Sequence, residues 1–176
     1  NGYLECFQLP YADGDRPLWD AGQMLENRNP SSRSIFTAVG NHELPFTTGS
    51  AGALMPYMEA ATEEEAAALI RWGRGETVPD LRYRYGQALG DIIHATPVVV
   101  GPPAGFHATE SFQAFADYWQ DRRKQVYVGA NDGMIHAFNG QTGVEEWAFV
   151  PEFALPMFSV MADSGYCHRY SCDQTV

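Results

Sequence analysis

Two histidines and an aspartate are the residues of this chain best suited to chemistry. His94 and His136 each lie beside strand-like residues, and Asp91 stands three positions before His94. Imidazole is a common metal ligand and a general base near neutral pH, so the two histidines would suit a metal-binding or catalytic pair. Buried polar side chains usually find hydrogen-bond partners within the fold, however. We therefore expect both histidines to be structural, and we expect Asp91 to cap or orient a turn.

Three cysteines offer a second kind of chemistry. Four residues separate Cys167 from Cys172, which is close enough for a disulfide across a loop and favours an oxidising, extracytoplasmic compartment. Cys6 is then left over, either free or paired with another segment. Zinc is the competing interpretation, because His168 follows Cys167, but no second Cys or His pair stands at zinc spacing. We predict the Cys167–Cys172 disulfide, and no catalytic, cofactor-binding or metal-binding residue.

The clearest structural pattern is the stretch of residues 126–150. Val126 and Val128 alternate with other residues, as do Ile135 and Ala137, which is typical of half-buried strands. Two tight turns join these strands, at Asn131, Asp132 and Gly133 and at Thr142 and Gly143. Trp147 is an aromatic residue in the third strand. Three meandering strands with such turns describe most of one β-propeller blade.

The rest of the chain predicts helices around this β unit. Thr62 and Glu65 form a capping box that begins a helix, and residues 111–119 place apolar side chains on one helix face. Residues 40–56 are rich in turn formers and predict a loop. The fold class is mainly β with helical insertions, a partial β-propeller with quinoprotein-like blades. We expect a mixed α/β segment at 1–80 and the first blade or blades at 81–176.

Composition limits the partners. The 176 residues include 22 acidic and 11 basic side chains, for a formal net charge of -11. This charge argues against nucleic acid or an anionic membrane surface as the main partner. No run of 18 apolar residues is present, so we expect no membrane span. Because a blade buries its faces against its neighbours, we expect this chain to need a further segment, from the same or another chain.

An ordered set of motifs resembles one known family. Residues 89–101 (LGDIIHATPVVVG) and 126–138 (VYVGANDGMIHAF) resemble the C-terminal propeller of the PilY/PilC family of type IV pilus biogenesis factors and pilus-tip adhesins. Further stretches follow the family in the same order: 18–22, 33–37, 69–75, 142–143, 146–151, 168–170 and Asp173. The resemblance covers nearly the whole chain.

The resemblance implies a non-enzymatic protein of the cell surface or pilus tip, exported from the cell. It implies partnership with minor pilins, support of pilus extension against retraction, and contact with host cells or abiotic surfaces. Members of the family often carry a calcium loop. Asp13 and Asp15 do not fit such a loop, so calcium is expected elsewhere in the full-length protein, if at all.

Two other classes use similar blades. A quinone-cofactor dehydrogenase has Asp-Gly and Thr-Gly turns of this kind, but it would show several such blades and adjacent half-cystines. A generic extracellular propeller scaffold without a pilus connection is the third interpretation. Co-purification of a redox cofactor would favour the first of these alternatives, and pull-down of minor pilins would favour the pilus assignment.

Overall fold

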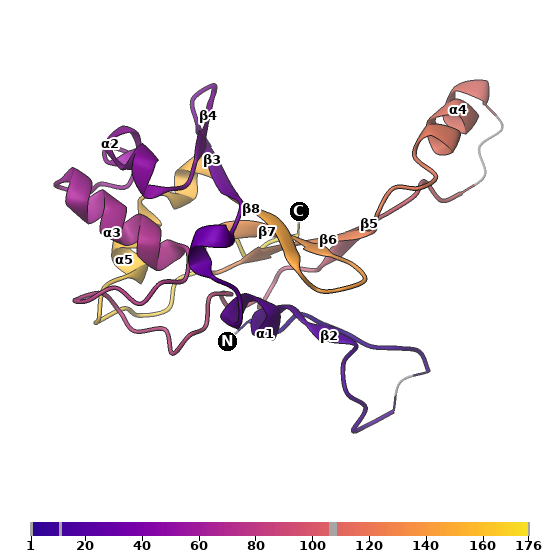
Figure 1. Ribbon diagram of the computed structural model, residues 1–176, viewed down its shortest axis with the longest axis horizontal. Helices are drawn as coiled ribbons and strands as arrows, with labels where there is room; N and C mark the ends of the chain where they lie inside the picture. Colours follow the sequence, from indigo (N-terminus) through magenta and orange to yellow (C-terminus); the bar gives the residue numbers. More distant parts are fainter. Residues whose placement is uncertain (1, 11, 106–108, 176) are drawn as a thin grey trace.

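Four antiparallel strands form the blade that the sequence predicts. The computed structural model describes residues 2–10, 12–105 and 109–175, so the outermost residues of the two predicted domains, Asn1 and Val176, lie outside the described part. The blade strands are β5 (Val98–Val100), β6 (Gln125–Ala130), β7 (Met134–Asn139) and β8 (Glu145–Val150). They pair in that order, which confirms a mainly β, partial propeller (Figure 1).

A hairpin from the first half of the chain extends this sheet to six strands. β3 (Ile35–Val39) pairs in parallel with β8, and β4 (His42–Pro45) pairs antiparallel with β3 on the outer edge. The prediction of a loop at 40–56 is therefore wrong, because this stretch contains β4, the short helix η2 (Thr48–Ser50) and α2 (Ala51–Leu54). β4 lacks the alternating burial of a half-buried strand, and its Pro45 suits only an edge position.

The two faces of the sheet differ in burial. The strand β3 alternates between buried and half-buried residues, as does the start of β6. Cross-strand pairs share a face, so the register assigns every strand residue to one side. We call the buried side the closed face. Val99 of β5 pairs with Val126 and so lies on the same side, but it is 63% exposed, so this face is not covered at β5. The buried residues of the closed face are Ile35, Thr37, Val39, Val126, Val128, Ala130, Met134, His136, Phe138, Glu145, Ala148 and Val150.

Segments from both halves of the chain cover the closed face. At the β3–β8 end, α2, α3 (Glu63–Gly73) and α5 (Met157–Met161) form one apolar cluster with the sheet (Figure 1). At the β6 end the cover comes from β1 (Glu5–Cys6), β2 (Trp19–Asp20), α1 (Ala21–Glu26) and the stretch 88–95. The single-turn helices η1 (Pro30–Ser32) and η3 (Glu152–Ala154) connect these layers to the sheet.

The predicted capping residue begins α3. The Thr62 hydroxyl accepts a hydrogen bond from the backbone N–H of Glu65 at 3.1 Å, which satisfies a free donor of the first turn. The Glu65 carboxylate reaches back to the N–H of Ala61 at 2.7 Å instead of to the cap residue itself. The helix therefore starts where the sequence predicts, and its Leu69, Ile70 and Trp72 side chains are buried in the core.

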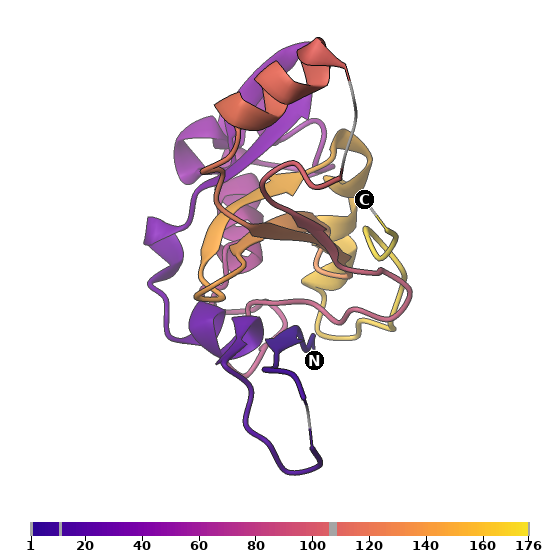
Figure 2. The ribbon, with the colours of Figure 1, turned by 90° about the vertical axis from the view of Figure 1, so that its right-hand side faces the viewer.

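One helix stands away from the rest. α4 (Glu110–Tyr118) lies at the tip of an arm between β5 and β6, and none of its residues is buried (Figures 1 and 2). Its position confirms the predicted helix, although its apolar residues do not pack on the sheet. None of the helices within the described ranges is long and apolar enough to cross a membrane.

Candidate functional site

Four charged side chains lie together in the middle of the closed face. His136 is in β7, Glu145 begins β8, Asp132 belongs to the turn between β6 and β7, and Arg33 precedes β3. Each of these side chains is at most 2% exposed. They lie between the two apolar clusters, away from water, so each buried charge must be balanced by an opposite charge within the group.

Direct hydrogen bonds join the four groups into one chain. His136 Nδ1 lies 2.8 Å from Glu145 Oε1, and His136 Nε2 lies 3.2 Å from both oxygens of Asp132. Arg33 donates from Nε and Nη2 to the two oxygens of Glu145, each at 2.8 Å, which is the two-pronged geometry preferred by guanidinium and carboxylate. Asp132 also accepts from the backbone N–H of Gly90 at 2.7 Å and of Met134 at 3.1 Å.

This environment fixes the protonation of the network. Burial alone would lower the pKa of His136, but the Asp132 charge and the hydrogen bonds to Asp132 and Glu145 outweigh it and raise that pKa to about 9. Burial would raise the pKa of Glu145, but hydrogen bonds from His136 and Arg33 hold it well below its usual range. The pKa of Asp132 is likewise lowered, since His136 outweighs its burial. At neutral pH, two cations therefore face two anions.

The protonated state limits what His136 can do. As an imidazolium it donates from both ring nitrogens, and both donors are already engaged by carboxylates. A general base or a metal ligand needs a free nitrogen lone pair, which His136 in this state does not offer. This geometry favours the structural interpretation of His136 and Asp132.

A second network ties three separate segments together. The Asp173 carboxylate accepts hydrogen bonds from the backbone N–H groups of Ile93, His94 and Ala95, at 2.9 to 3.0 Å, and from the Asn131 side chain at 3.0 Å. Burial would raise the pKa of Asp173, but these backbone donors lower it. Asn131 in turn accepts from the N–H of Ser171 at 2.9 Å. The turn between β6 and β7 thus anchors both the stretch before β5 and the end of the described chain.

The remaining predicted residues take separate positions. Asp91 accepts at 3.2 Å from the Asn131 side chain, while its carbonyl oxygen accepts from the Asn131 N–H at 3.0 Å. His94 is 61% exposed and contacts Asp173, so it belongs to a different network from His136 and the two do not form a pair.

The predicted turn residues lie in the two hairpin turns. Gly133 and Gly143 adopt φ values of +87° and +71° there. Thr142 is exposed in the second turn, where its hydroxyl accepts from the N–H of Val144 at 3.4 Å. Trp147 is half-buried on the opposite face.

Sequence patterns did not reveal Glu145. Trp147 is two residues later, so strict alternation would place both side chains on one face. The pairing of β7 with β8 is irregular between Ala137 and Phe138: Ala137 faces Trp147, whereas Phe138 faces Glu145. This bulge turns Glu145 inward. Arg33 was noted only as part of a family-like stretch, and only the three-dimensional pairing shows its role.

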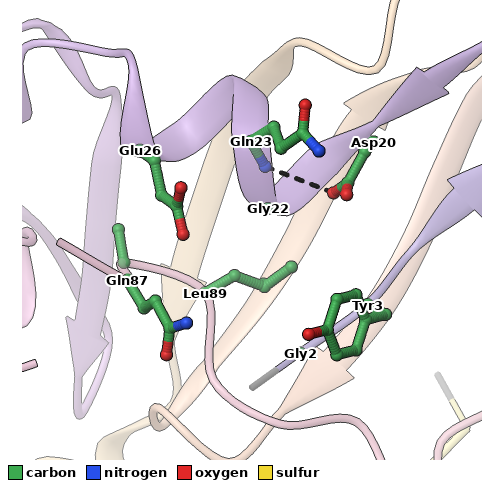
Figure 3. A pocket seen from close by; sticks show the side chains of 9 residues that line it. Gly2, Tyr3, Asp20, Gly22, Gln23, Glu26, Gln87 and Leu89 are labelled. Carbon is green, nitrogen blue, oxygen red and sulfur yellow. Dashed lines mark hydrogen bonds between the residues drawn. The ribbon is translucent and has the colours of Figure 1, made fainter. Parts of the chain in front are cut away.

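Two hollows lie near these networks, and the second borders them through Asp91, Asn131 and Asp132. One, of about 200 Å³, is lined by residues of α1 and of the stretch 87–89, with Tyr3, Asp20 and Glu26 at its wall (Figure 3). There the Asp20 carboxylate accepts from the N–H of Gln23 and thereby caps α1. Another, of about 230 Å³, lies over Arg82, Arg84 and Asp91. No group of three or more His, Cys, Asp or Glu side chains suited to a metal occurs in the part of the chain that the structure describes.

Comparison with known proteins identifies the family. Residues 89–162 match the family described as the PilY1 beta-propeller domain. A Pseudomonas aeruginosa UCBPP-PA14 protein named type IV pilus biogenesis factor PilY1 is 36% identical over 89% of this chain, and a Xylella fastidiosa Temecula1 PilY1 homolog is 32% identical over 93% of it. This chain belongs to the PilY1 family. No solved structure matches it.

The PilY1 match coincides with the structural blade. The matched residues 89–162 contain β5 to β8 and α5, including Asp132, His136 and Glu145. Similarity to the PilY1 relatives extends beyond the blade, because their alignments cover most of the chain. The chain spans 15% of the length of the Pseudomonas relative and 13% of the Xylella one. The chain therefore corresponds to only a small part of each relative.

The cysteines of this PilY1-family chain are free thiols in the structure. Cys167 is exposed, Cys172 is buried and Cys6 is half-buried. Burial raises the pKa of the Cys172 thiol to about 11, so this thiol is mostly protonated at neutral pH. The predicted Cys167–Cys172 disulfide is not formed in the structure, and the pairing stays a prediction for oxidising conditions.

Proposed function

We propose that this chain is the opening blade, with its lead-in segment, of a non-enzymatic PilY1-type propeller. The whole protein would work with minor pilins at the pilus tip, support extension against retraction and contact host-cell or abiotic surfaces after export. The family itself is tied to type IV pilus biogenesis. The observation that carries the proposal is the extent of the similarity, which covers the blade together with the β3–β4 hairpin and helices that complete it.

The buried network supports a scaffold role. Its four charged groups are satisfied by one another and by the backbone, and no buried polar side-chain atom in the described residues lacks a partner. A catalytic site typically keeps at least one such group available to a substrate. The blade is therefore better suited to holding a binding surface than to performing chemistry.

A chromosomal substitution can test the pilus role. Glu145→Gln should break the network and reduce surface pili, measured as sheared pilin, while Glu5→Gln should leave them unchanged because Glu5 is exposed in β1. If the protein opposes retraction, inactivating the retraction motor should restore pili to the Glu145→Gln strain. Pili that stay absent would indicate a role in assembly alone. Unchanged pili after deletion of the whole gene would overturn the proposal.

Adhesion and enzymatic activity need separate measurements. The unsubstituted and Glu145→Gln strains can be compared at equal pilus numbers once the retraction motor is inactivated in both. If the protein is an adhesin, these two strains should differ in attachment to host cells or abiotic surfaces. Equal attachment would remove adhesion from the proposal. The purified full gene product should contain no redox cofactor and should not oxidise alcohols or sugars. Such an activity would favour the dehydrogenase alternative.

A further inference from the structure

The hollow of about 230 Å³ is lined by two arginines that lack an acidic partner. Its wall consists of Trp72 of α3, residues of the stretch 82–91, the turn between β6 and β7, and Tyr166. Among the described residues, neither Arg82 nor Arg84 has a carboxylate oxygen within 4.0 Å. The chain has twice as many acidic as basic residues, so two unpaired arginines in one hollow need a physical explanation.

Aromatic rings hold both guanidinium groups in place. The Arg82 Cζ atom lies 4.5 Å from the ring centroid of Tyr166 and 5.3 Å from that of Trp72, and the Arg84 Cζ atom lies 4.8 Å from that of Trp72. Such cation–π contacts position a cation without neutralising its charge. Burial lowers the pKa of Arg84 to about 10 and also lowers the pKa of Arg82. Both guanidinium groups are therefore still charged at neutral pH.

Arg82 has two donor nitrogens that are not used by the fold. Its Nε donates to the Met161 carbonyl oxygen at 2.6 Å, whereas Nη1 and Nη2 have no partner among the described residues. No buried polar side-chain atom of these residues lacks a partner, so the two unpaired nitrogens are accessible to solvent. Arg84 differs, because its Nη1 and Nη2 donate to the carbonyl oxygens of Trp72 and Ala88. Arg82 can thus donate two parallel hydrogen bonds to a carboxylate, and Arg84 adds positive charge nearby.

The two carboxylates of the wall have partners of their own. Asp132 is bound to His136 and to backbone N–H groups, as described above. Asp91 accepts a hydrogen bond from Asn131 at 3.2 Å and lies 3.5 Å from Nε2 of His168. The Asp91 side chain is 31% exposed, so it can also accept a hydrogen bond from a ligand hydroxyl group. The hollow therefore combines unused cationic donors with an accessible acceptor.

Two tyrosines of the wall suit a ligand with a ring. Tyr83 and Tyr85 are 56% and 80% exposed, and their ring centroids lie 4.7 Å apart in an edge-to-face arrangement. Exposed aromatic faces attract the slightly positive C–H groups of a sugar ring. Gln87 in the same wall is half-buried and can both donate to and accept from hydroxyl groups. Pockets for drug-sized ligands start at about 300 Å³, so this smaller hollow suits a single sugar unit.

We propose that this hollow binds a sugar unit that carries a carboxylate, such as a uronic acid. In this arrangement, Arg82 holds the carboxylate with Nη1 and Nη2, the two tyrosines contact the ring, and Asp91 and Gln87 bind its hydroxyl groups. A neutral sugar would leave Arg82 without an acidic partner, and a small anion without a ring would leave the tyrosines unused. Binding needs no pilus, so this inference goes beyond the proposed function and can fail independently of it.

Titration of the purified full gene product with glucuronate tests the inference. Glucose has a hydroxymethyl group in place of the carboxylate, and acetate has a carboxylate without a ring, so these two ligands are the controls. Isothermal titration calorimetry should show glucuronate binding at least about tenfold more tightly than either control, because hydrogen bonds to a charged group are stronger than neutral ones. Undetectable binding of glucuronate, or equal binding of glucose or acetate, would overturn the inference.

Substitutions then locate the binding in this hollow. Arg82→Gln should weaken glucuronate binding about tenfold or more, whereas Arg71→Gln removes an exposed arginine outside the hollow and should not. Because Arg82 also donates to Met161, Tyr83→Ala provides a second variant that removes only an exposed ring, with Tyr118→Ala on α4 as its control. Tyr83→Ala should weaken binding and keep the melting temperature of the unsubstituted protein. Unchanged affinity in folded Arg82→Gln or in Tyr83→Ala, or an equal loss in the matching control, would overturn the assignment.

Discussion

At the scale of single residues, the charge balance around His136 explains how a polar motif can sit inside an apolar layer. Arg33 and His136 carry positive charge, while Asp132 and Glu145 carry negative charge, and all four lie within hydrogen-bond distance of a partner. A buried ion pair often adds little net stability compared with a well-packed apolar pair, because both charges lose water. Removing one member is different, since it leaves the opposite charge buried without compensation.

Glu145 is therefore the most sensitive position of the network. We expect Glu145→Gln to lower the free energy of unfolding by about 3–5 kcal/mol, because Arg33 and His136 lose their shared carboxylate. Urea denaturation of the full gene product, followed by tryptophan fluorescence, measures this. The control Glu5→Gln removes an exposed carboxylate in β1 and should change stability by less than about 0.5 kcal/mol. Equal effects of the two substitutions would contradict the network.

The raised pKa of His136 predicts an alkaline limit to stability. A group whose folded-state pKa is raised contributes stability that is fully present below its unfolded value of 6.5 and is lost as pH rises to about 9. The loss over this window amounts to about 3.5 kcal/mol, because each tenfold change in proton affinity corresponds to about 1.4 kcal/mol. Denaturation midpoints between pH 6 and 10 should show this decline in the unsubstituted protein.

Two variants identify the responsible group. His136→Gln should start from a lower stability and lose the decline, because the titrating imidazole is gone. His94→Gln removes a 61% exposed imidazole and should keep the decline, since His136 is intact. Glu145 and Asp132 have lowered pKa values, so their contribution is present at neutral pH and is lost only as the solution becomes acidic. A decline that persists in His136→Gln would assign it to another group.

At the scale of elements, the turn before β8 couples the blade to the lead-in segment. Gly143 has a φ of +71°, and a Cβ there would lie 2.7 Å from the Trp19 ring. Trp19 also donates from Nε1 to the Gly140 carbonyl oxygen at 3.2 Å. Glycine is needed here both for the left-handed backbone and for the close approach of the indole.

Comparing two glycines separates these effects. Gly40 also has a positive φ, +55°, but a Cβ there meets nothing within 4 Å. Gly40→Ala should therefore cost only the backbone strain, about 1–2 kcal/mol. Gly143→Ala should cost clearly more, because it also displaces Trp19, and it should alter the near-UV dichroism of the indole. Thermal or urea denaturation of both variants measures the difference. Equal losses would mean that the Trp19 contact is unimportant.

The elements that sequence patterns predict well are those with local signals. Alternation and turn residues predicted β6, β7 and β8, and the Thr62 cap predicted the start of α3. The β3–β8 pairing joins residues more than 100 positions apart, so no local pattern could reveal it. The bulge in β8 places Glu145 on the side opposite to Trp147, and no local pattern reveals this either, because register is a property of two strands together.

At the scale of the whole molecule, the two predicted domains share one sheet and one core. β3, β4, α2 and α3 come from residues 1–80, yet β3 adds to the blade and α3 packs in the same apolar cluster as α5. The boundary near residue 80 stays a prediction about sequence organisation. Physically, the lead-in segment completes the blade, because it covers the closed face and pairs with β8, which would otherwise be an exposed edge.

This arrangement predicts how residues 1–176 behave without the rest of a longer polypeptide. Most of the closed face is covered, but the opposite side of the sheet, the open face, leaves Phe36, Trp147 and Phe149 only half-buried. The isolated chain should therefore associate or melt without full cooperativity. Sedimentation and calorimetry over a range of concentrations measure both properties. Phe36→Lys should weaken the association, because it places a charge on the open face, whereas Phe153→Lys changes an exposed aromatic outside the sheet and should not. A monomer with one sharp, concentration-independent transition would show instead that the chain needs no partner segment, and that the aromatic group on its open face is stable in water.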